Sequence, residues 1–172
     1  MPTLSELVDL LHGWYPPATA DSWDAVGLVA GDPDQDVSKV LFAVDPVLPV
    51  AQEAAEWGAE LLVVHHPLFL KGVHGVARTT PKGRTLGVLQ DAGCALLTAH
   101  TNADQALTGV FESMAYALGL RDIVPIVASA PGSSTGPGRL ATVDETTRVA
   151  LGSAVAEAGL ALQYADGEHQ EA

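Results

Sequence analysis

Short apolar runs alternate with longer amphipathic stretches over the first three quarters of the chain. Three of these runs lack the alternation of a half-exposed strand, and Leu61–Val64 is also rich in β-branched residues. Such runs are typical of strands that are covered on both faces. The sequence therefore predicts buried strands at Val40–Val44, Leu61–Val64 and Cys94–Ala99, and a further short strand leading up to Gly31.

Between the strands, apolar residues recur at helical spacing and capping signals bound the helices. Thr3 and Glu6 form a capping box, Gly58 suits a helix C-terminus, and Pro81 suits a helix start. The predicted helices are Leu4–His12, Leu48–Trp57, Pro81–Gln90 and Val110–Leu118. Alternating strands and helices predict an α/β fold, in which a layered, largely parallel sheet is flanked by helices.

The last quarter of the chain has a different character. Ala130–Gly138 is small, polar and rich in proline and glycine, which is typical of a loop or linker. Around it we predict strands at Ile123–Val127, Leu140–Val143 and Leu160–Tyr164, and a helix from Glu145 to Ala158. The predicted division is an α/β region over 1–127, a flexible loop over 128–139 and a partial second α/β segment over 140–172.

Composition narrows the classes of partner. The chain has 172 residues, 48% of them hydrophobic, which suits a globular protein with a proper core. Its formal charge is -13, with eight Lys and Arg and no basic run, so a nucleic acid would be repelled. A small anionic substrate remains compatible with this charge, because a bound divalent cation would dominate the local field.

The sequence also carries signals about compartment. Met1–Glu6 lacks the cationic and then apolar segments of a signal peptide, and no apolar run is long enough to span a bilayer. The single cysteine, Cys94, lies in an apolar run and has no partner for an internal disulfide. We therefore expect a buried, inert thiol, a reducing cytoplasmic compartment and no membrane association.

Candidate metal chemistry begins where the buried strand Leu61–Val64 ends. His65 and His66 follow it directly, and Pro67 disfavours continuation of the strand. At a strand end the backbone can bend, so both imidazoles could turn into one cavity and serve one metal or bridge two. The alternative interpretation is a pair of surface or helix-capping histidines.

A second polar cluster follows the strand Cys94–Ala99. His100 and Asp104 come after this strand, and ligands of open α/β sheets bind outside the carboxyl ends of the strands. Imidazoles with a carboxylate suit zinc, manganese, iron or nickel rather than calcium. His100 could coordinate directly, or it could hydrogen-bond a ligand or a backbone carbonyl.

Three motifs occur in order along the chain: Trp23–Leu28, His65–Gly72 and His100–Asp104. Through these motifs the chain resembles the Nif-three-like proteins, also named type 2 GTP cyclohydrolase I homologs, over about residues 1 to 127. The resemblance implies a ring-shaped homo-oligomer of α/β subunits, each with a dinuclear centre of divalent transition metals. It makes His65, His66 and Asp104 metal ligands.

Two departures from the family pattern change what is expected. Ala25 stands where the family usually has Asn, so a polar contact is expected to be missing there. Family members also continue beyond this length and supply a further His and Glu near their C-terminus. Glu168–Glu171 contains His169, but we interpret this polar segment as a solvated tail. The metal site of this chain is therefore expected to lack those ligands.

Three functional hypotheses follow. The first is a metal-dependent hydrolase of a nucleotide or phosphoester, in which His100 is a proton shuttle or positions a ligand. The second is a non-catalytic protein that binds or delivers metal. The third is a remnant of the family whose metal site is incomplete.

Overall fold

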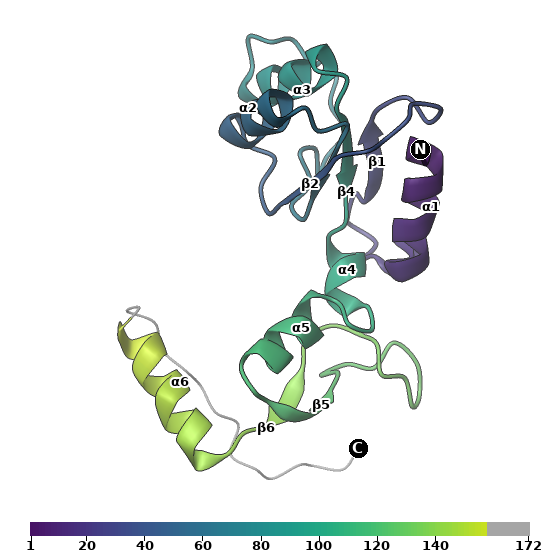
Figure 1. Cartoon of the computed structure of the whole chain (residues 1–172). Coiled ribbons are helices and arrows are strands. Elements are labelled where there is room, and N and C mark those ends of the chain that lie inside the picture. Colours follow the sequence, from purple (N-terminus) through teal and green to yellow (C-terminus); the bar gives the residue numbers. More distant parts are fainter. Residues whose placement is uncertain (158–172) are drawn as a thin grey trace.

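The centre of the protein is a four-stranded sheet (Figure 1). The computed structural model describes residues 1–157. The strands are β1 (Gly27–Ala30), β2 (Val40–Ala43), β3 (Leu61–Val64) and β4 (Ala95–Thr98), in the order β1-β4-β3-β2. β2, β3 and β4 run parallel, whereas β1 is antiparallel to β4. The predicted α/β fold with a largely parallel sheet is confirmed.

Helices cover both faces of this sheet. They are α1 (Leu4–Trp14), α2 (Leu48–Trp57) and α3 (Pro81–Asp91). α1 packs on one face, where Leu4 joins Val63 and Leu97 in a core cluster. α2 and α3 pack on the other face over Leu62 and Leu96. Because successive strand residues point to opposite faces, β3 and β4 are apolar at nearly every position.

The capping signals in the sequence operate as expected. The Thr3 side chain accepts from the Glu6 N–H, and the Glu6 carboxylate accepts from the Thr3 N–H. α2 is capped at its C-terminal end by Gly58, which has a φ of 73°, a conformation that favours glycine. α1 is longer than predicted: it runs on to Trp14 because the Tyr15 N–H still bonds to the Leu11 carbonyl.

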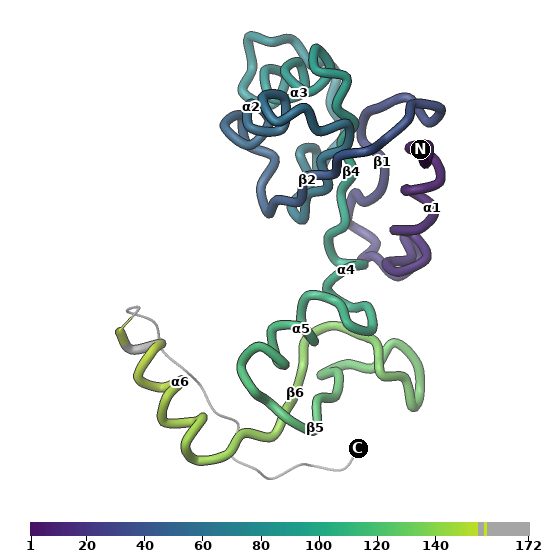
Figure 2. The backbone as a smooth tube through the Cα atoms, in the orientation of Figure 1, coloured from purple at the N-terminus to yellow at the C-terminus, as the bar shows by residue number. Residues whose placement is uncertain are grey.

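The remaining described elements lie mainly beyond the central sheet. They are the 3-10 helix η1 (Pro17–Thr19), α4 (Thr101–Gln105), α5 (Val110–Ala117), β5 (Arg121–Val124), β6 (Leu140–Thr142) and α6 (Glu145–Glu157). β5 and β6 form a two-stranded antiparallel sheet. Figure 2 shows the backbone passing from the central sheet to α5 through α4, with α6 farther out.

Sequence-based bounds are less accurate in this part. The strand predicted at Ile123–Val127 instead spans Arg121–Val124, whereas Leu140 and Glu145 begin β6 and α6 as predicted. The predicted strand Leu160–Tyr164 lies outside the described residues. In the loop over 128–139, the Gly136 N–H donates to the Gln105 carbonyl at 3.2 Å. The predicted three-part division of the chain stays a prediction.

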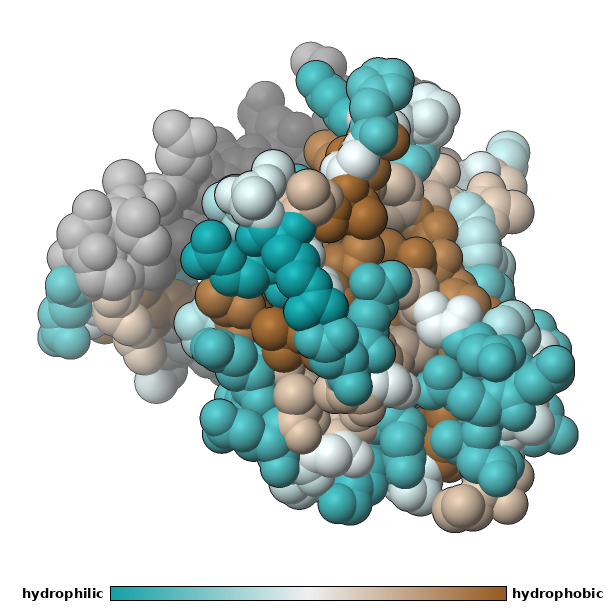
Figure 3. All heavy atoms as spheres, turned by 90° about the horizontal axis from the view of Figure 1, so that it is seen from above, coloured by the Kyte–Doolittle hydropathy of each residue, from teal (hydrophilic) through white to brown (hydrophobic). Residues whose placement is uncertain are grey.

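The surface is mixed in character. Figure 3 shows hydrophilic residues over much of the face seen from above, with apolar residues between them. Three tryptophans are about half exposed or more: Trp14, Trp23 and Trp57. Within residues 1–157, every helix is too short or too polar to cross a membrane.

Candidate metal centre

Polar side chains follow all three parallel strands where they meet at one edge of the sheet. Asp45 follows β2, His65 and His66 follow β3, and His100 follows β4. The hydrogen-bond ladder continues past the strand ends. The N–H groups of His65 and His66 donate to carbonyls at the end of β2, at 3.2 and 2.9 Å. These backbone hydrogen bonds therefore fix the positions from which the side chains of His65 and His66 extend.

Three imidazoles converge at this edge. The ring centroid of His65 lies 5.0 Å from those of both His66 and His100, and the His66 and His100 centroids lie 5.7 Å apart. One ring nitrogen of each histidine lies within 4.8 Å of the others. This group of three could hold a metal ion.

The hydrogen bonds of the rings indicate which nitrogen is available. Each Nδ1 lies at hydrogen-bond distance from a carbonyl or carboxylate oxygen, so a neutral ring places its proton on Nδ1 and donates it. The pairs are His65 with the Ala99 carbonyl at 3.1 Å, His66 with the Asp45 carboxylate at 2.7 Å and His100 with the Asp24 carboxylate at 2.9 Å. Nε2 then keeps its lone pair, which is the arrangement of metal-ligating histidines.

Asp24 has the most constrained carboxylate of the site. Its side chain is fully buried, and Oδ1 accepts from His100 Nδ1 and the Ala25 N–H. Oδ2 accepts from the N–H and the hydroxyl of Thr101, at 3.1 and 2.5 Å. Burial raises the pKa of Asp24, but these hydrogen bonds together hold it below its ordinary value. The ionised carboxylate accepts at both oxygens and fixes the orientation of His100.

Asp104 reaches the same space from α4. The helix begins directly after His100, and the Asp104 N–H donates to the His100 carbonyl at 2.9 Å. Asp104 Oδ1 lies 3.6 Å from His65 Nε2, and its side chain is 13% exposed. Burial raises the pKa of Asp104 above its ordinary value, although the nearby imidazoles of His65 and His100 oppose this shift.

The donor set fits a transition metal. Three imidazoles with tethered Nδ1 groups and one largely buried carboxylate are the nitrogen and oxygen ligands that such metals prefer. A divalent cation would also favour the ionised form of Asp104, which burial otherwise disfavours.

The structure brings together all four site residues singled out from the sequence: His65, His66, His100 and Asp104. Which of them coordinate stays a prediction. Sequence reasoning did not assign roles to Asp24 and Asp45. Asp45 carried a usable signal, since it ends a parallel strand as His65 does. Asp24 lay inside a family-like motif, but its contact with His100 spans 76 positions of sequence.

The fold and this edge define the protein as an α/β protein with a histidine cluster that could hold a metal ion at the carboxyl ends of its parallel strands. More specifically, the chain belongs to the Duf34/NIF3 (NGG1p interacting factor 3) family, whose model matches residues 2–169. The expected resemblance to the Nif-three-like proteins is confirmed.

Curated relatives are longer than this chain. A GTP cyclohydrolase 1 type 2 homolog of Streptomyces coelicolor is 50% identical over 142 residues, which cover 81% of this chain and 50% of the relative. A protein of the same name from Mycobacterium bovis is 43% identical over 156 residues, covering 91% of this chain and 40% of the relative. The chain thus spans half or less of the length of these relatives.

Solved structures confirm the fold. Staphylococcus aureus protein SA1388 matches with a TM-score of 0.69 and 38% identity, over 73% of this chain and 36% of that one. Reduced HcgD from Methanocaldococcus jannaschii matches with a TM-score of 0.67 and 27% identity, over 73% of this chain and 50% of that one. A Bacillus cereus protein related to NIF3 has a TM-score of 0.71 at 30% identity, over 76% of this chain and 36% of that one.

Proposed function

We propose that the chain binds a divalent transition metal through His65, His66 and Asp104, with His100 facing the same space. The observation that carries this proposal is the tethering of all three imidazoles through Nδ1, which leaves the Nε2 lone pairs available. The three histidines each place a ring nitrogen within 4.8 Å of the others. Zinc, manganese, iron and nickel suit these ligands. The family resemblance implies two metals in each intact site.

The reaction that we propose is metal-dependent hydrolysis of a nucleotide or phosphoester. A divalent metal in this site would act as a Lewis acid and lower the pKa of a water molecule. His100 would accept a proton at Nε2, and the buried Asp24 carboxylate would stabilise the imidazolium that forms. The name of the relatives, GTP cyclohydrolase 1 type 2 homolog, supports a nucleotide as the substrate class.

Turnover by metal-loaded protein tests this reaction. The chain would be loaded separately with zinc, manganese, iron and nickel, and hydrolysis of GTP and of bis(4-nitrophenyl) phosphate would be followed. We expect metal-dependent turnover that His65→Ala abolishes. His74→Ala is the matched control, because His74 lies exposed in the loop that follows the site. Bound metal without turnover of either substrate would contradict the hydrolase proposal.

Metal binding or delivery without catalysis is the second candidate function. The His66 side chain is 50% exposed, so a partner could reach this side of the cluster. Exchange of bound metal with an acceptor, without turnover, would favour delivery. Loss of metal-dependent catalysis in Asp104→Ala would count against it. A chain that binds no stoichiometric metal would instead fit the remnant hypothesis.

The proposal also covers the oligomeric state of the protein, the charge of its substrate and its location in the cell. The resemblance implies a ring-shaped homo-oligomer, and we propose a small anionic substrate and a cytoplasmic location. These remain predictions. Size-exclusion chromatography with light scattering would test the oligomer, and a monomer at micromolar concentration would contradict it.

A further inference from the structure

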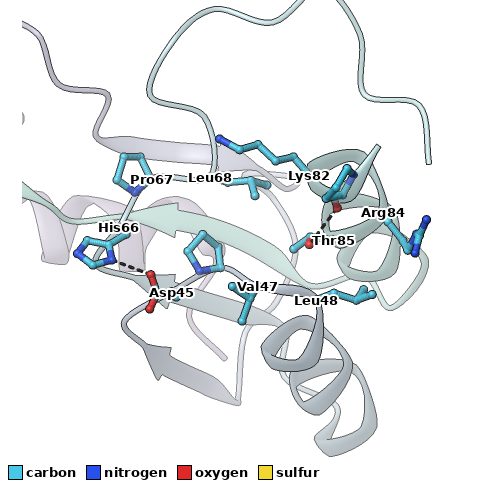
Figure 4. A pocket seen from close by; sticks show the side chains of 11 residues that line it. Asp45, Val47, Leu48, His66, Pro67, Leu68, Lys82, Arg84 and Thr85 are labelled. Carbon is cyan, nitrogen blue, oxygen red and sulfur yellow. Dashed lines mark hydrogen bonds and ion pairs between the residues drawn. The ribbon is translucent and has the colours of Figure 1, made fainter. Parts of the chain in front are cut away.

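A cavity of about 410 Å³ opens beside the histidine cluster (Figure 4). Its walls come from three segments: residues 45–48 after β2, residues 66–68 after β3, and the start of α3. His66 belongs both to these walls and to the imidazole cluster. Cavities of this size hold small molecules in other proteins, and this one lies outside the carboxyl ends of two parallel strands.

The walls are mainly apolar. In Figure 4, Val47 and Leu48 lie on one side of the cavity, and Pro67 and Leu68 lie across from them. Pro46 and Pro81 also line it. Val47 is 48% exposed, which is high for an apolar residue. The hydroxyl of Thr85, which also lines the cavity, donates to the Pro81 carbonyl. A ligand body that fits these walls is itself apolar, such as an aromatic ring.

Positive charge lies at the same cavity in an otherwise acidic protein. Arg78, Arg121 and Arg148 each pair with a carboxylate. Within residues 1–157, the two cations that line the cavity, Lys82 and Arg84, form no such ion pair.

Lys82 is the cation on the side of the metal centre. In Figure 4 its side chain extends from α3 toward Pro67 and Leu68, whereas Arg84 points away from His66. The Lys82 ammonium lies 5.9 Å from the centroid of the Phe69 ring. The one carboxylate that lines the cavity, Asp45, is bonded to His66. Lys82 and His66, a member of the histidine cluster, therefore line the same cavity.

We propose that this cavity is the binding site for an aryl phosphate, whose ring packs between the Val47 and Leu68 walls and whose phosphate meets Lys82 beside His66. This inference rests on the proposed function and narrows its substrate to phosphoesters in which the phosphate is esterified directly to an aromatic ring. Because the cavity and its lysine do not depend on a metal, the binding site is testable separately from catalysis.

The test is binding of 4-methylumbelliferyl phosphate to the full chain, after metal removal with a chelator that is then dialysed away. Fluorescence titration would be run beside 4-methylumbelliferone and inorganic phosphate. We expect saturable binding of the aryl phosphate, and at least about tenfold weaker binding of either half alone, since each half lacks the wall contacts or the charge-assisted hydrogen bond.

Two variants locate the site. Lys82→Gln removes an exposed charge and is expected to weaken binding about tenfold, whereas Lys71→Gln, a matched control outside the cavity, leaves binding within about twofold. Val47→Asp places a negative charge in the wall. Val47 is the N-cap of α2 and gives no side-chain cap, so Asp there would stabilise the helix while it repels the phosphate.

Val47→Asp should thus weaken binding without lowering stability. We expect an unchanged or higher Tm with at least about tenfold weaker binding, whereas Val73→Asp, which adds the same charge in the exposed loop, leaves binding unchanged. The proposal is overturned if the aryl phosphate does not bind saturably, or if each variant binds like its control. If the chain binds the aryl phosphate but takes up no metal or shows no turnover, the proposed function is contradicted and the binding site is not.

Discussion

Two regions of the protein differ in how they bury their apolar residues. The sheet region, residues 1–105, contains two core clusters, one on each face of the sheet. In the hairpin region, residues 106–157, the described buried apolar side chains are only Ala106 and Ala115. Two of the larger apolar residues there, Tyr116 and Ile126, are about 60% exposed.

This difference explains where the candidate site can be built. His65, His66 and His100 emerge from β3 and β4, whose residues are buried on both faces. A metal site needs ligands held by rigid elements, and the sheet region supplies them. The hairpin region covers little of its own apolar surface and provides no comparable support among the described residues.

The largest expected effect is on folding stability. Leu62 is fully buried in the core between the sheet and helices α2 and α3, so Leu62→Ala should lower the free energy of unfolding by about 2–5 kcal/mol. Ile126→Ala should change it by less than about 0.5 kcal/mol, because Ile126 is 59% exposed. Urea unfolding measures both. Similar losses of unfolding free energy in the two variants would contradict the difference in burial between the two regions.

Thiol reactivity gives the next largest contrast. Burial raises the pKa of the Cys94 thiol to about 11. At pH 8 its thiolate fraction is therefore on the order of one in a thousand, against about a quarter for a free cysteine. Labelling with a thiol reagent should be at least about a hundredfold slower for Cys94 than for Ile126→Cys in a Cys94→Ala background. Equal rates would show that the sheet region opens readily.

Removal of the buried charge of Asp24 is expected to lower metal affinity, and this effect is smaller than the two above. In Asp24→Asn, the amide must turn its NH2 group toward the N–H of Ala25 or of Thr101, which weakens the hold on His100. We expect metal affinity to fall about 10- to 100-fold by calorimetric titration. Asp45→Asn should have less effect, because Asp45 is 58% exposed and water can replace its contact. Equal losses would contradict the distinct role of Asp24.

The same contrast decides what could be predicted from the sequence. Leu48–Trp57 and Leu61–Val64 are predicted to the residue, because a left-handed glycine and a two-faced apolar run leave little choice of bounds. In the hairpin region, the apolar run that includes Ile126 and Val127 predicted a strand over Ile123–Val127. Both residues are exposed, and the strand ends at Val124. Apolar sequence predicts position well only where the chain buries it.

The sequence predicted which residues lie at the site, but it did not predict the tertiary hydrogen bonds that hold them there. Strand ends followed by polar residues placed His65, His66, His100 and Asp104 at one edge of the sheet, since β3 and β4 are parallel neighbours. The four donors around Asp24 could not be read from the sequence, because Asp24 precedes β1 and reaches His100 only through the folded sheet.

The metal content of the purified chain tests the central claim most directly. Elemental analysis after loading and desalting would compare the parent protein with His65→Ala, Asp104→Ala and the control His74→Ala. We predict stoichiometric transition metal in the parent and in His74→Ala, and little or none in His65→Ala and Asp104→Ala. A parent chain without stoichiometric metal, or full metal content in His65→Ala, would contradict the claim.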